Sequence, residues 1–457
     1  MSSPLWQHQR AAADLLAPLG SGALFLDMGG GKTRTALELI ERWQCNCVLI
    51  LCPKAVCQVW PSEFAKHLDA PWLAYGFDRG TVTKRAGAVL AEHHEAQRLG
   101  LPFAVAINYE SLIHKPMPDV LASIPWDCLI MDESHRLKAP GGKLSMTAAK
   151  LAARIPHRLA LTGTPMPHSP LDVYAQFRAV NPDVLGKSFR DFERTYTIKV
   201  ERQRRDGRKF WQIVGHRNLD HLQDRIAPHV YRVSAADVLD LPPVTDLVRY
   251  CLLEPRAQRI YHGIEADLKA DLDAGTVTVN NALTKLLRLA QVCNGWVPDD
   301  DGAMTQTGTE KQDLLSDLLA DLPPSEPLVC FGRFRTDLDA IRAVANAHGR
   351  LCGELSGRCN HLRHWQDGDC DVLAVQLHAG GLGVDLTRAR YQVYYALDYS
   401  LGDYLQTRAR IHRPGQTRPV TYIHLLAAGT VDERVMTALQ QRQEIVGAVV
   451  DGLRRHN

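Results

Sequence analysis

The sequence predicts an α/β protein with two parallel-sheet lobes in tandem, helical insertions and a C-terminal helix. Short apolar runs with strand character alternate with helical segments in both halves of the chain. The breaker Asp240-Leu-Pro-Pro243 separates the two series. At 457 residues, the chain also exceeds what one hydrophobic core usually supports. We therefore expect a first lobe over residues 1–240 and a second over 241–457.

Composition limits the class of protein. The formal charge is only +2, so a nucleic-acid partner would have to be bound by local basic patches. The N-terminus lacks the apolar core of a signal peptide, and we find no run of about 18 apolar residues that could span a membrane. We expect a cytoplasmic protein with no membrane contact.

The cysteines are expected to be reduced thiols, because their number is odd, at eleven, and no secretion signal is present. Two clusters raise the alternative of a zinc site. The first comprises Cys45, Cys47, Cys52 and Cys57, but the run from Cys47 to Cys52 reads as a buried strand where cysteine is a small apolar residue. The second, over residues 352–370, has irregular spacing for zinc ligands.

Residues 23–35 of the first lobe read as strand, glycine turn and helix, the pattern of a phosphate-binding Walker A loop. Three glycines follow the apolar run 23–26, so backbone amides can approach phosphate oxygens at a helix N-terminus. Lys32 would reach the β- and γ-phosphates, and the Thr33 hydroxyl would bind Mg²⁺. Leu26 departs from the usual pattern, which has Gly or Ala there. A plain Gly-rich connection is the alternative. The three glycines are Gly29, Gly30 and Gly31.

A helix is predicted just upstream of this loop, over residues 4–16. Its Gln9 carries a paired donor and acceptor that could read the edge of an adenine. A solvated helix face would explain the same pattern.

A second anchor is the strand that begins at Trp126 and ends in Asp132 and Glu133. Carboxylates at the carboxyl end of a strand beside the phosphate site can hold Mg²⁺ (Asp132) and orient or deprotonate the attacking water (Glu133). Acid pairs after strands also occur as helix caps. Their position about a hundred residues after Lys32 favours nucleotide hydrolysis.

A further strand ends in Thr162-Gly163-Thr164-Pro165, and its hydroxyls are placed to sense the γ-phosphate site. The alternative is an ordinary strand exit. From residue 186 to about 241 the alternation lapses. Here residues 200–211 predict a basic hairpin with an Asp206-Gly207 turn, which could bind phosphates through Arg205 and Arg208 or be a solvated hairpin.

The second half predicts helices over residues 255–295 and then a second sheet with no phosphate loop of its own. A glycine-rich loop, residues 376–387, could bring amides close to a nucleic-acid phosphate. Next comes a segment around Arg410 and Arg413. We expect both on one face of a helix, pointing at the γ-phosphate as arginine fingers. The alternative is a basic helix terminus that satisfies its own carbonyls.

Together these motifs resemble helicase superfamily two: Gly-Gly-Gly-Lys-Thr, Asp-Glu-Ser-His and Leu-Thr-Gly-Thr-Pro are similar to its motifs I, II and III. Arg410-Ile-His-Arg-Pro-Gly-Gln416 resembles motif VI of the switch/sucrose-nonfermenting (SWI/SNF) type ATPases. That branch is echoed by residues 379–387, by Leu286 to Asn294 and by Gly429-Thr-Val-Asp-Glu-Arg434. The sequence departs from the family pattern at three positions. Leu26 stands where Gly or Ala is usual, Ser134 where Ala or Gly is frequent, and Asp385 where Asn is usual.

The resemblance implies two RecA-like lobes with ATP and Mg²⁺ between them and nucleic acid, most often double-stranded DNA, crossing both. It implies a motor that translocates on duplex DNA, often without separating the strands. We expect a compact viral or bacterial form of this motor that acts as a monomer. Further residues receive roles on this basis. Cofactor contacts are expected at Gly383 and Asp385; coupling at His135, Thr162, Thr164, Gln406 and Gln416; nucleic-acid contacts at Lys54, Asn108, Tyr109, Arg205, Arg208, Arg333, Gly380 and Gly381.

Two other functions stay open at this point. One is a helicase that separates strands of RNA or acts on single-stranded DNA. The other is an ATP-gated nucleic-acid clamp without productive hydrolysis, which the intact Lys32, Glu133 and Arg413 oppose.

Overall fold

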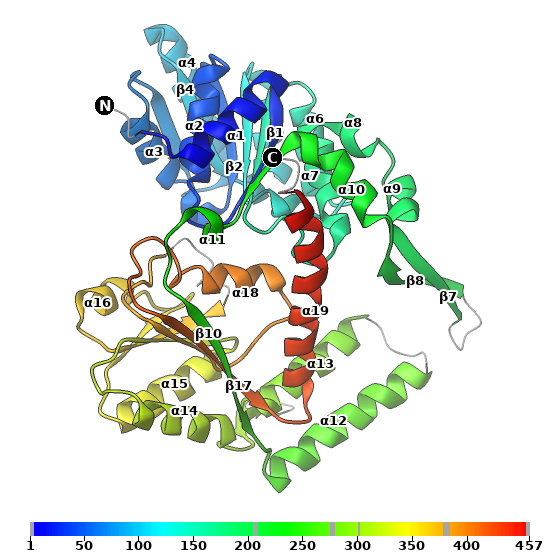
Figure 1. Ribbon diagram of the computed structural model, residues 1–457, viewed down its shortest axis with the longest axis vertical. Helices are drawn as coiled ribbons and strands as arrows, with labels where there is room; N and C mark the ends of the chain where they lie inside the picture. The colour runs from blue at the N-terminus through cyan, green and yellow to red at the C-terminus, as the bar shows by residue number, and fades with distance from the viewer. Residues whose placement is uncertain (1–3, 204–208, 275–278, 300–301, 378–383, 454–457) are drawn as a thin grey trace. The chain divides into compact units, whose positions relative to one another are not determined.

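The computed structural model describes residues 4–203, 209–274, 279–299, 302–377 and 384–453. The chain divides into two units, shown in Figure 1. The first unit comprises residues 1–199, 213–239 and 444–457, and the second comprises 200–212 and 240–443. Each unit has its own sheet, and all strand pairs of the two large sheets are parallel. The predicted class, two parallel-sheet lobes in tandem, is confirmed.

The first unit has a seven-stranded sheet in the order β3-β4-β2-β5-β6-β1-β9. Its strands are β1 (Ser21–Leu26), β2 (Cys47–Cys52), β3 (Leu73–Phe77), β4 (Phe103–Asn108), β5 (Cys128–Asp132), β6 (His157–Leu161) and β9 (Val230–Val233). The α-helices are α1 (Gln7–Leu16), α2 (Lys32–Arg42), α3 (Val59–His67), α4 (Val82–Leu99), α5 (Met117–Ser123), α6 (Lys143–Ala152), α7 (Val173–Val180), α8 (Pro182–Leu185), α9 (Phe189–Tyr196), α10 (Leu219–Ile226) and α11 (Ala235–Val238). Short 3₁₀ turns include η2 (Lys54–Val56), η3 (Tyr109–Ile113) and η4 (Ser134–Leu137).

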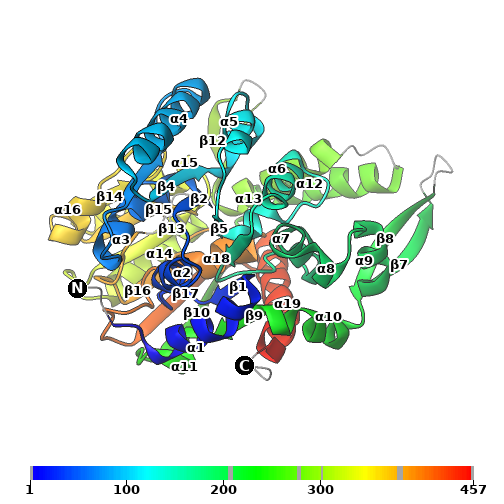
Figure 2. The same ribbon diagram turned by 90° about the horizontal axis from the view of Figure 1, so that it is seen from above.

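Alternate side chains of the buried strands decide which helices cover which face. Leu24 and Leu26 of β1 pack in one cluster with apolar residues of α1, α2 and α3. Ala23 and Phe25 point the other way, into a cluster built with residues of α4 to α10. Figure 2 shows helices on both faces of this sheet. Both faces are covered, as a parallel sheet requires.

The second unit has a six-stranded sheet in the order β10-β17-β16-β13-β15-β14. Its strands are β10 (Val244–Cys251), β13 (Leu328–Gly332), β14 (Cys352–Leu355), β15 (Val372–Gln376), β16 (Tyr391–Tyr394) and β17 (Val420–Ala427), with a small pair β11 (Trp296–Pro298) and β12 (Met304–Gln306). The helices are α12 (Pro255–Ala274), α13 (Val279–Cys293), α14 (Glu310–Asp321), α15 (Arg335–Ala347), α16 (Leu362–Asp367), α18 (Leu401–Arg408) and α19 (Val431–Gly452).

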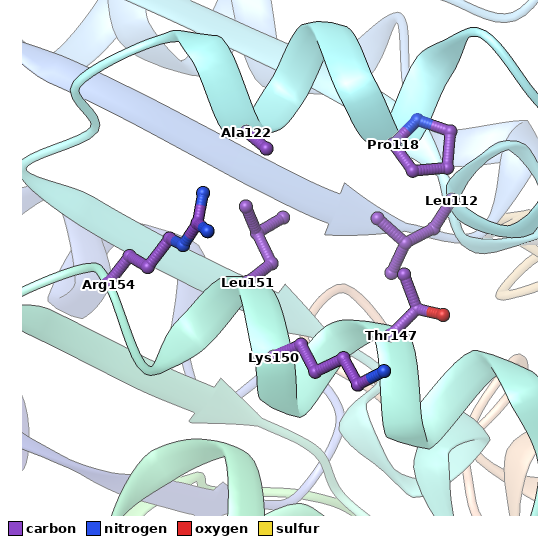
Figure 3. Close-up of a pocket in the computed structure, with 7 residues that line it drawn as sticks. All are labelled: Leu112, Pro118, Ala122, Thr147, Lys150, Leu151 and Arg154. Atoms are coloured by element: carbon purple, nitrogen blue, oxygen red, sulfur yellow. The ribbon is translucent and has the colours of Figure 1, made fainter.

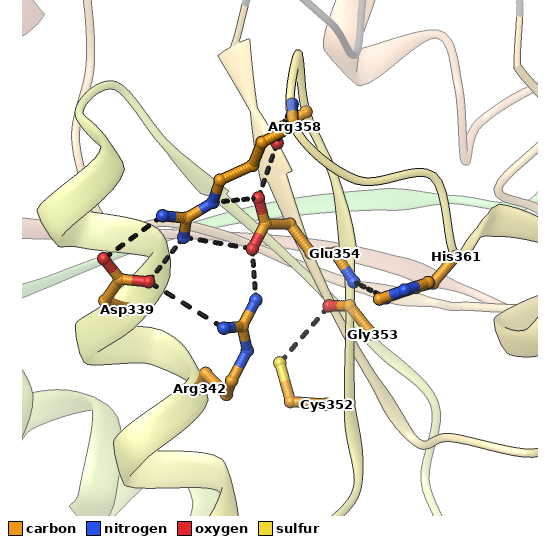
Figure 4. A network of polar contacts seen from close by, with 8 residues as sticks. Asp339, Arg342, Cys352, Gly353, Glu354, Arg358 and His361 are labelled. Atoms are coloured by element: carbon orange, nitrogen blue, oxygen red, sulfur yellow. Dashed lines mark hydrogen bonds and ion pairs between the residues drawn. The ribbon is translucent and has the colours of Figure 1, made fainter.

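A buried carboxylate holds the edge of this second sheet. Glu354 of β14 has no exposed surface and pairs with Arg342 of α15 and with Arg358, whose Nε donates to its Oε1 at 2.7 Å. Arg358 also pairs with Asp339 of α15 (Figure 4). The charge of Glu354 is thus compensated by two guanidinium groups, as a buried carboxylate requires.

The last part of α19 differs from the expected domain boundaries. Residues from Glu444 onward belong with the first unit rather than the second. Val449, Val450 and Leu453 are buried in the first unit's core, and Gln223 Nε2 donates to the carbonyl of Val449 at 3.0 Å. Apolar burial assigns this segment, which position along the chain could not indicate.

The predicted basic hairpin is present as β7 (Thr197–Gln203) and β8 (Lys209–His216). Its Arg205 and Arg208 lie outside the described residues. Several of its described apolar side chains are exposed, most of all Trp211 at 63 %.

Two structural findings bear on the other expectations. Among the helices of the described ranges, none is long and apolar enough to cross a lipid bilayer. The same residues contain no cluster of three or more His, Cys, Asp or Glu side chains arranged to hold a metal ion. All eleven cysteines are free thiols.

Candidate ATP site

The phosphate loop connects the fully buried strand β1 to α2. Gly29 and Gly31 have φ angles of +82° and +76°, which side chains rarely adopt. A Cβ on Gly30 would lie 3.1 Å from the carbonyl oxygen of Asp27, and one on Gly31 would lie 2.0 Å from Nε2 of Gln9. Each glycine therefore has a steric reason, and the cradle they leave fits a phosphate group at the start of α2.

Lys32 and Thr33 form the first turn of α2. The ammonium of Lys32 folds back on the loop and donates to the carbonyls of Leu26 at 3.0 Å and Asp27 at 3.4 Å. Both acceptors are neutral carbonyl groups, so a phosphate oxygen would be a stronger partner for the same charge. The hydrogen-bond donors of this loop fit the phosphates of a nucleoside triphosphate.

Helix α1 packs directly on the loop. His8 Nε2 lies 3.0 Å from the carbonyl oxygen of Gly30, and Gln9 Nε2 donates to the carbonyl of Gly31 at 3.4 Å. Gln9 is buried, and its Oε1 accepts from the backbone amide of Trp6. Gln9 thus lies beside the phosphate loop, and its reading of adenine stays a prediction.

Strand order brings the acidic pair to the same edge. Strand β6 lies between β1 and β5, and all three end near the loop. Burial and the adjacent Glu133 raise the pKa of Asp132 to about 7, against the opposing effect of Lys32. A carboxylate crowded by a second carboxylate favours a bound cation, which fits Mg²⁺. Glu133 has a φ of +51°, a left-handed conformation found where a site constrains the backbone.

The expected coupling residues of the first unit form one connected chain. Glu133 Oε2 lies 3.3 Å from His135 Nδ1, which is 3.0 Å from Thr162 Oγ1 and 3.5 Å from Thr164 Oγ1. The amide of Thr164 donates to Thr162 Oγ1 at 3.0 Å. The structure therefore brings together residues that the sequence placed in two separate motifs.

The nucleic-acid residues expected in this unit fall into two groups. Lys54 in η2 is exposed at the carboxyl end of β2. Asn108 is buried, and its amide bonds Glu110, Arg85 and Ser111. Tyr109 has no exposed surface, and its hydroxyl donates to the carbonyl of Asp132 at 2.8 Å. Asn108 and Tyr109 are therefore largely or fully buried, and their contact with a nucleic acid stays a prediction.

The arginine pair of the second unit does not lie on a helix, so that expectation is wrong. Helix α18 ends at Arg408, and Arg410 and Arg413 occupy the turns that follow. Pro414 lacks the N–H that would bond the carbonyl of Arg410 in a continued helix, and this carbonyl accepts instead from the amide of Leu386 at 3.1 Å. Arg410 is 7 % exposed, and Arg413 Nη1 donates to the carbonyl of Val384 at 3.5 Å.

The turns are held by Gln416, one of the expected coupling residues. Its Nε2 donates to the carbonyls of Thr387 (3.0 Å), Ala389 (2.8 Å) and Ile411 (3.3 Å). Gln416 thereby ties the arginine turn to the segment 384–389, which contains the end of the glycine-rich loop. Gln406 of α18 is buried.

Asp385 closes a turn in that segment, because its Oδ1 accepts from the amide and the hydroxyl of Thr387 at 2.9 and 2.7 Å. Gly380, Gly381 and Gly383 lie outside the described residues. Arg333 follows β13 and pairs with Asp398 at 3.3 Å.

Three residues at the first unit's site escaped the sequence analysis. Trp60 Nε1 donates to Asp132 Oδ2 at 3.2 Å. A Cβ on Gly163 would lie 3.2 Å from the carbonyl oxygen of Leu26 and 3.6 Å from Lys32 Nζ, so a larger residue after β6 would crowd the backbone at the start of the loop. Arg232 of β9 bonds the carbonyl of Phe25 at 2.8 Å and Asp27 at 2.5 Å. The Thr-Gly-Thr sequence was the one available signal, for Gly163.

A cavity of about 150 Å³ lies elsewhere in the first unit, between η3, α5 and α6 (Figure 3). Leu112, Leu151 and Pro118 line it together with the cations Lys150 and Arg154. None of the proposed ATP-site residues lines it.

Comparison with protein families matches the model described as "SNF2-related domain" over residues 8–296. The chain belongs to the SNF2-related family. A second model, "Helicase conserved C-terminal domain", matches residues 310–415 of the SNF2-related chain. The resemblance drawn from the motifs is confirmed at the level of the family.

Relatives of the SNF2-related chain include eukaryotic and phage proteins. The Danio rerio "Chromodomain-helicase-DNA-binding protein 1-like" is 27 % identical over 93 % of this chain and 41 % of the relative. The Mus musculus "DNA repair and recombination protein RAD54B" is 24 % identical over 94 % of this chain and 54 % of the relative. "Putative protein p41" of Acyrthosiphon pisum secondary endosymbiont phage 1 is 25 % identical over 98 % of both chains.

The SNF2-related chain thus spans about half or less of the two named eukaryotic relatives but nearly all of the phage protein. Among solved structures, the "Sulfolobus solfataricus SWI2/SNF2 ATPase core in complex with dsDNA" is 20 % identical, covers 98 % of this chain and 93 % of its own, and has a TM-score of 0.45.

Proposed function

We propose that this chain is a motor that hydrolyses ATP to ADP and phosphate and uses the energy to translocate on double-stranded DNA. The observation that carries the proposal is the assembly in the first unit. Three features lie at one edge of the sheet. They are the glycine cradle with Lys32, the acidic pair at the end of β5, and the side-chain contacts that run from Glu133 through His135 to Thr162. Membership of the SNF2-related family supports the same activity.

The residues divide the work by their chemistry. The loop amides and Lys32 hold the β- and γ-phosphates, and Thr33 and Asp132 hold Mg²⁺, which neutralises charge on the phosphates. Glu133 orients and deprotonates the attacking water. Arg410 and Arg413 stabilise the transferred phosphoryl group, a contribution worth about 10³ to 10⁵ in rate for arginine fingers.

The side-chain contacts from Glu133 through His135 to Thr162 supply a physical route that couples ATP hydrolysis to the segment after β6. A change at the γ-phosphate moves Glu133, and the shared contact at His135 transmits the movement to the segment after β6. ATP turnover would then depend on what that segment contacts.

The test is ATP turnover by the full chain with blunt duplex DNA, single-stranded DNA and RNA, each over a series of salt concentrations. We expect stimulation by duplex DNA, lost steeply as salt rises because phosphate contacts dominate. Displacement of a third strand from a DNA triplex should depend on ATP hydrolysis. Stimulation by RNA alone would instead indicate a strand-separating helicase.

The matched variant is Glu133→Gln, which keeps the side-chain volume and removes the base. It should bind ATP and hydrolyse it at least about 100-fold more slowly. An unchanged rate in this variant would refute hydrolysis at this site and favour the ATP-gated clamp.

A further inference from the structure

Two aromatic side chains converge on Asp132, one on its carboxylate and one on its main chain. Trp60 of α3 donates from Nε1 to Asp132 Oδ2 at 3.2 Å, and Tyr109 of η3 donates from its hydroxyl to the Asp132 carbonyl oxygen at 2.8 Å. Trp60 is 2 % exposed and Tyr109 is fully buried. Both side chains are thus shielded from solvent, so each depends on its own oxygen of Asp132 for a hydrogen bond.

The sheet order explains the convergence. Strand β2 is hydrogen-bonded to β5 on one side and β4 on the other. The segments that leave the carboxyl ends of β2 and β4 therefore meet at the end of β5, where Asp132 lies. Trp60 reaches it from the segment after β2, and Tyr109 directly follows β4.

The two donors restrain different things. The indole N–H restrains the torsion of the carboxylate by donating to Oδ2, and the backbone amide of Glu133 bonds the same carboxylate. The tyrosine hydroxyl fixes the peptide group between Asp132 and Glu133, at the point where the chain turns to a left-handed φ of +51°. Carboxylates that bind metals are commonly oriented by such outer hydrogen bonds.

The tyrosine segment is itself anchored on both sides. Glu110, its neighbour, accepts from Asn108 Nδ2 at 2.7 Å and pairs with Arg136 of η4 at 3.1 Å. Arg136 is only a few residues beyond Glu133 in sequence, so the segment 108–110 and the acidic motif form a closed set of contacts. Tyr109 is held in position by more than its own packing.

We propose that Trp60 and Tyr109 are positioning residues of the ATP site: Trp60 orients the Asp132 carboxylate toward the divalent cation, and Tyr109 sets the peptide that aims Glu133. The proposal rests on the proposed function. It assigns separable effects, since loss of the indole N–H acts on cation affinity and loss of the hydroxyl acts on turnover.

The experiment compares Trp60→Phe and Tyr109→Phe with matched controls in the same unit. Trp126→Phe removes an indole donor with a 2.8 Å bond to the carbonyl of Leu121, and Tyr196→Phe removes a hydroxyl 2.9 Å from His221. Trp126 and Tyr196 are both buried in the first unit's core. Each control loses the hydrogen bond of one buried indole or tyrosine side chain, and neither bond involves Asp132.

The first readout uses no hydrolysis. Binding of a fluorescent ADP to the full chain is measured in EDTA and over a Mg²⁺ series. Trp60→Phe should need about 10-fold or more Mg²⁺ for half of the Mg²⁺-dependent tightening. Its affinity in EDTA should stay within about twofold of wild type, as should both constants of Trp126→Phe.

The second readout is the ATP turnover rate at saturating Mg²⁺ and ATP. Tyr109→Phe should lower it by about 10-fold or more, because small misplacements of a catalytic group are costly, while Tyr196→Phe stays near wild type. Thermal unfolding shows whether each variant is folded. If Trp60→Phe does not fold, the Tyr109→Phe comparison still decides the tyrosine half.

The inference is overturned if wild type tightens with Mg²⁺ but Trp60→Phe has the same Mg²⁺ midpoint as Trp126→Phe. It is likewise overturned if Tyr109→Phe turns over ATP as fast as Tyr196→Phe. Both outcomes leave the proposed function standing. Failure of wild type to bind nucleotide would instead overturn the proposed function itself.

Discussion

Replacing Lys311 by methionine should destabilise the second unit by about 3 to 5 kcal/mol, the usual cost of removing one partner of a buried ion pair. Lys311 is 2 % exposed, and its ammonium lies 2.6 Å from Asp432 Oδ2. It also donates to Asn294 Oδ1 at 2.8 Å and to the carbonyl of Tyr395 at 3.1 Å. Methionine keeps much of the volume and removes the charge.

The magnitude follows from what is left behind. Asp432 is 8 % exposed and would keep the amide of Ala427 at 3.0 Å as a partner, but no cation among its described contacts. Asn294 donates to both carboxylate oxygens of Asp337, and its Oδ1 would lose the hydrogen bond that it accepts from Lys311. The loss therefore reaches α13, α14, β16 and the start of α19 together.

The assay is native-state hydrogen exchange of the full chain, read for the slowest amides of α14 and β13, because two units need not unfold in a single transition. The control is Arg249→Ala, which breaks a 2.7 Å ion pair with the 62 %-exposed carboxylate of Asp321 and should cost under about 1 kcal/mol. A Lys311→Met variant within 1 kcal/mol of wild type, on the same scale, would refute the reasoning.

The same pair has a pH signature. Burial lowers the pKa of Lys311, but Asp432 and neighbouring Cys293 raise it by more, so the folded pKa lies above its ordinary value. A raised pKa means that the folded state binds the proton more tightly than the unfolded state. The stabilisation is therefore complete below about pH 10.4 and is lost as pH rises through the folded pKa. On the alkaline side, the difference in unfolding free energy between wild type and Lys311→Met should narrow only as pH approaches the folded pKa of Lys311.

Three further variants test the ATP site and its supports. Gly31→Ala places a side chain at a φ of +76°, which costs roughly 1–2 kcal/mol, and should weaken nucleotide binding measured by fluorescence titration; unchanged affinity would contradict the role of the cradle. Thr162→Val removes the hydroxyl that contacts His135 and should reduce DNA stimulation of ATP turnover about 10-fold while leaving nucleotide affinity intact; equal loss of both would indicate a general disruption. Gln416→Leu removes three hydrogen bonds to carbonyls and should lower turnover by about 10-fold or more through the arginine turns, with the Michaelis constant for ATP nearly unchanged; a wild-type rate would exclude that support.

The elements that sequence predicted best are those whose strands end in distinctive residues. The run before Gly29 and the run before Asp132 are fully or almost fully apolar, so their strands β1 and β5 were placed to within a few residues. Of the two large sheets, strands β3, β9, β10 and β14 were not identified. β10 is largely exposed and carries polar residues along its length, so it lacks the apolar run that indicates a central strand. β3 is apolar but half-buried, and it contains Gly76, a residue type that is depleted in strands.

The contacts of the site were harder to predict than its residues. Trp60 and Asp132 are hydrogen-bonded although 72 positions separate them, and that pairing depends on the order of strands in the sheet. The helix expected around Arg410 does not form for a local reason. Pro414 occupies the position whose N–H would bond the carbonyl of Arg410 in a helix, and proline has no N–H. A proline three to four residues after a helical pattern was the available signal.

Two family-typical segments that the ATP site does not use meet at Lys311. The first ends in Asn294 and the second contains Asp432, and the lysine contacts both. Asn294 in turn bonds Asp337, which accepts from the amides of Arg333 and Phe334 just after β13. The residues of the family-typical motifs therefore form two groups. One lies at the strand ends of the ATP site, and the other, which includes Asn294 and Asp432, holds helices of the second unit together through Lys311. A loss of activity in the second group has to be compared with stability before it is assigned to catalysis, because its described contacts hold helices and the turn after β13 in place.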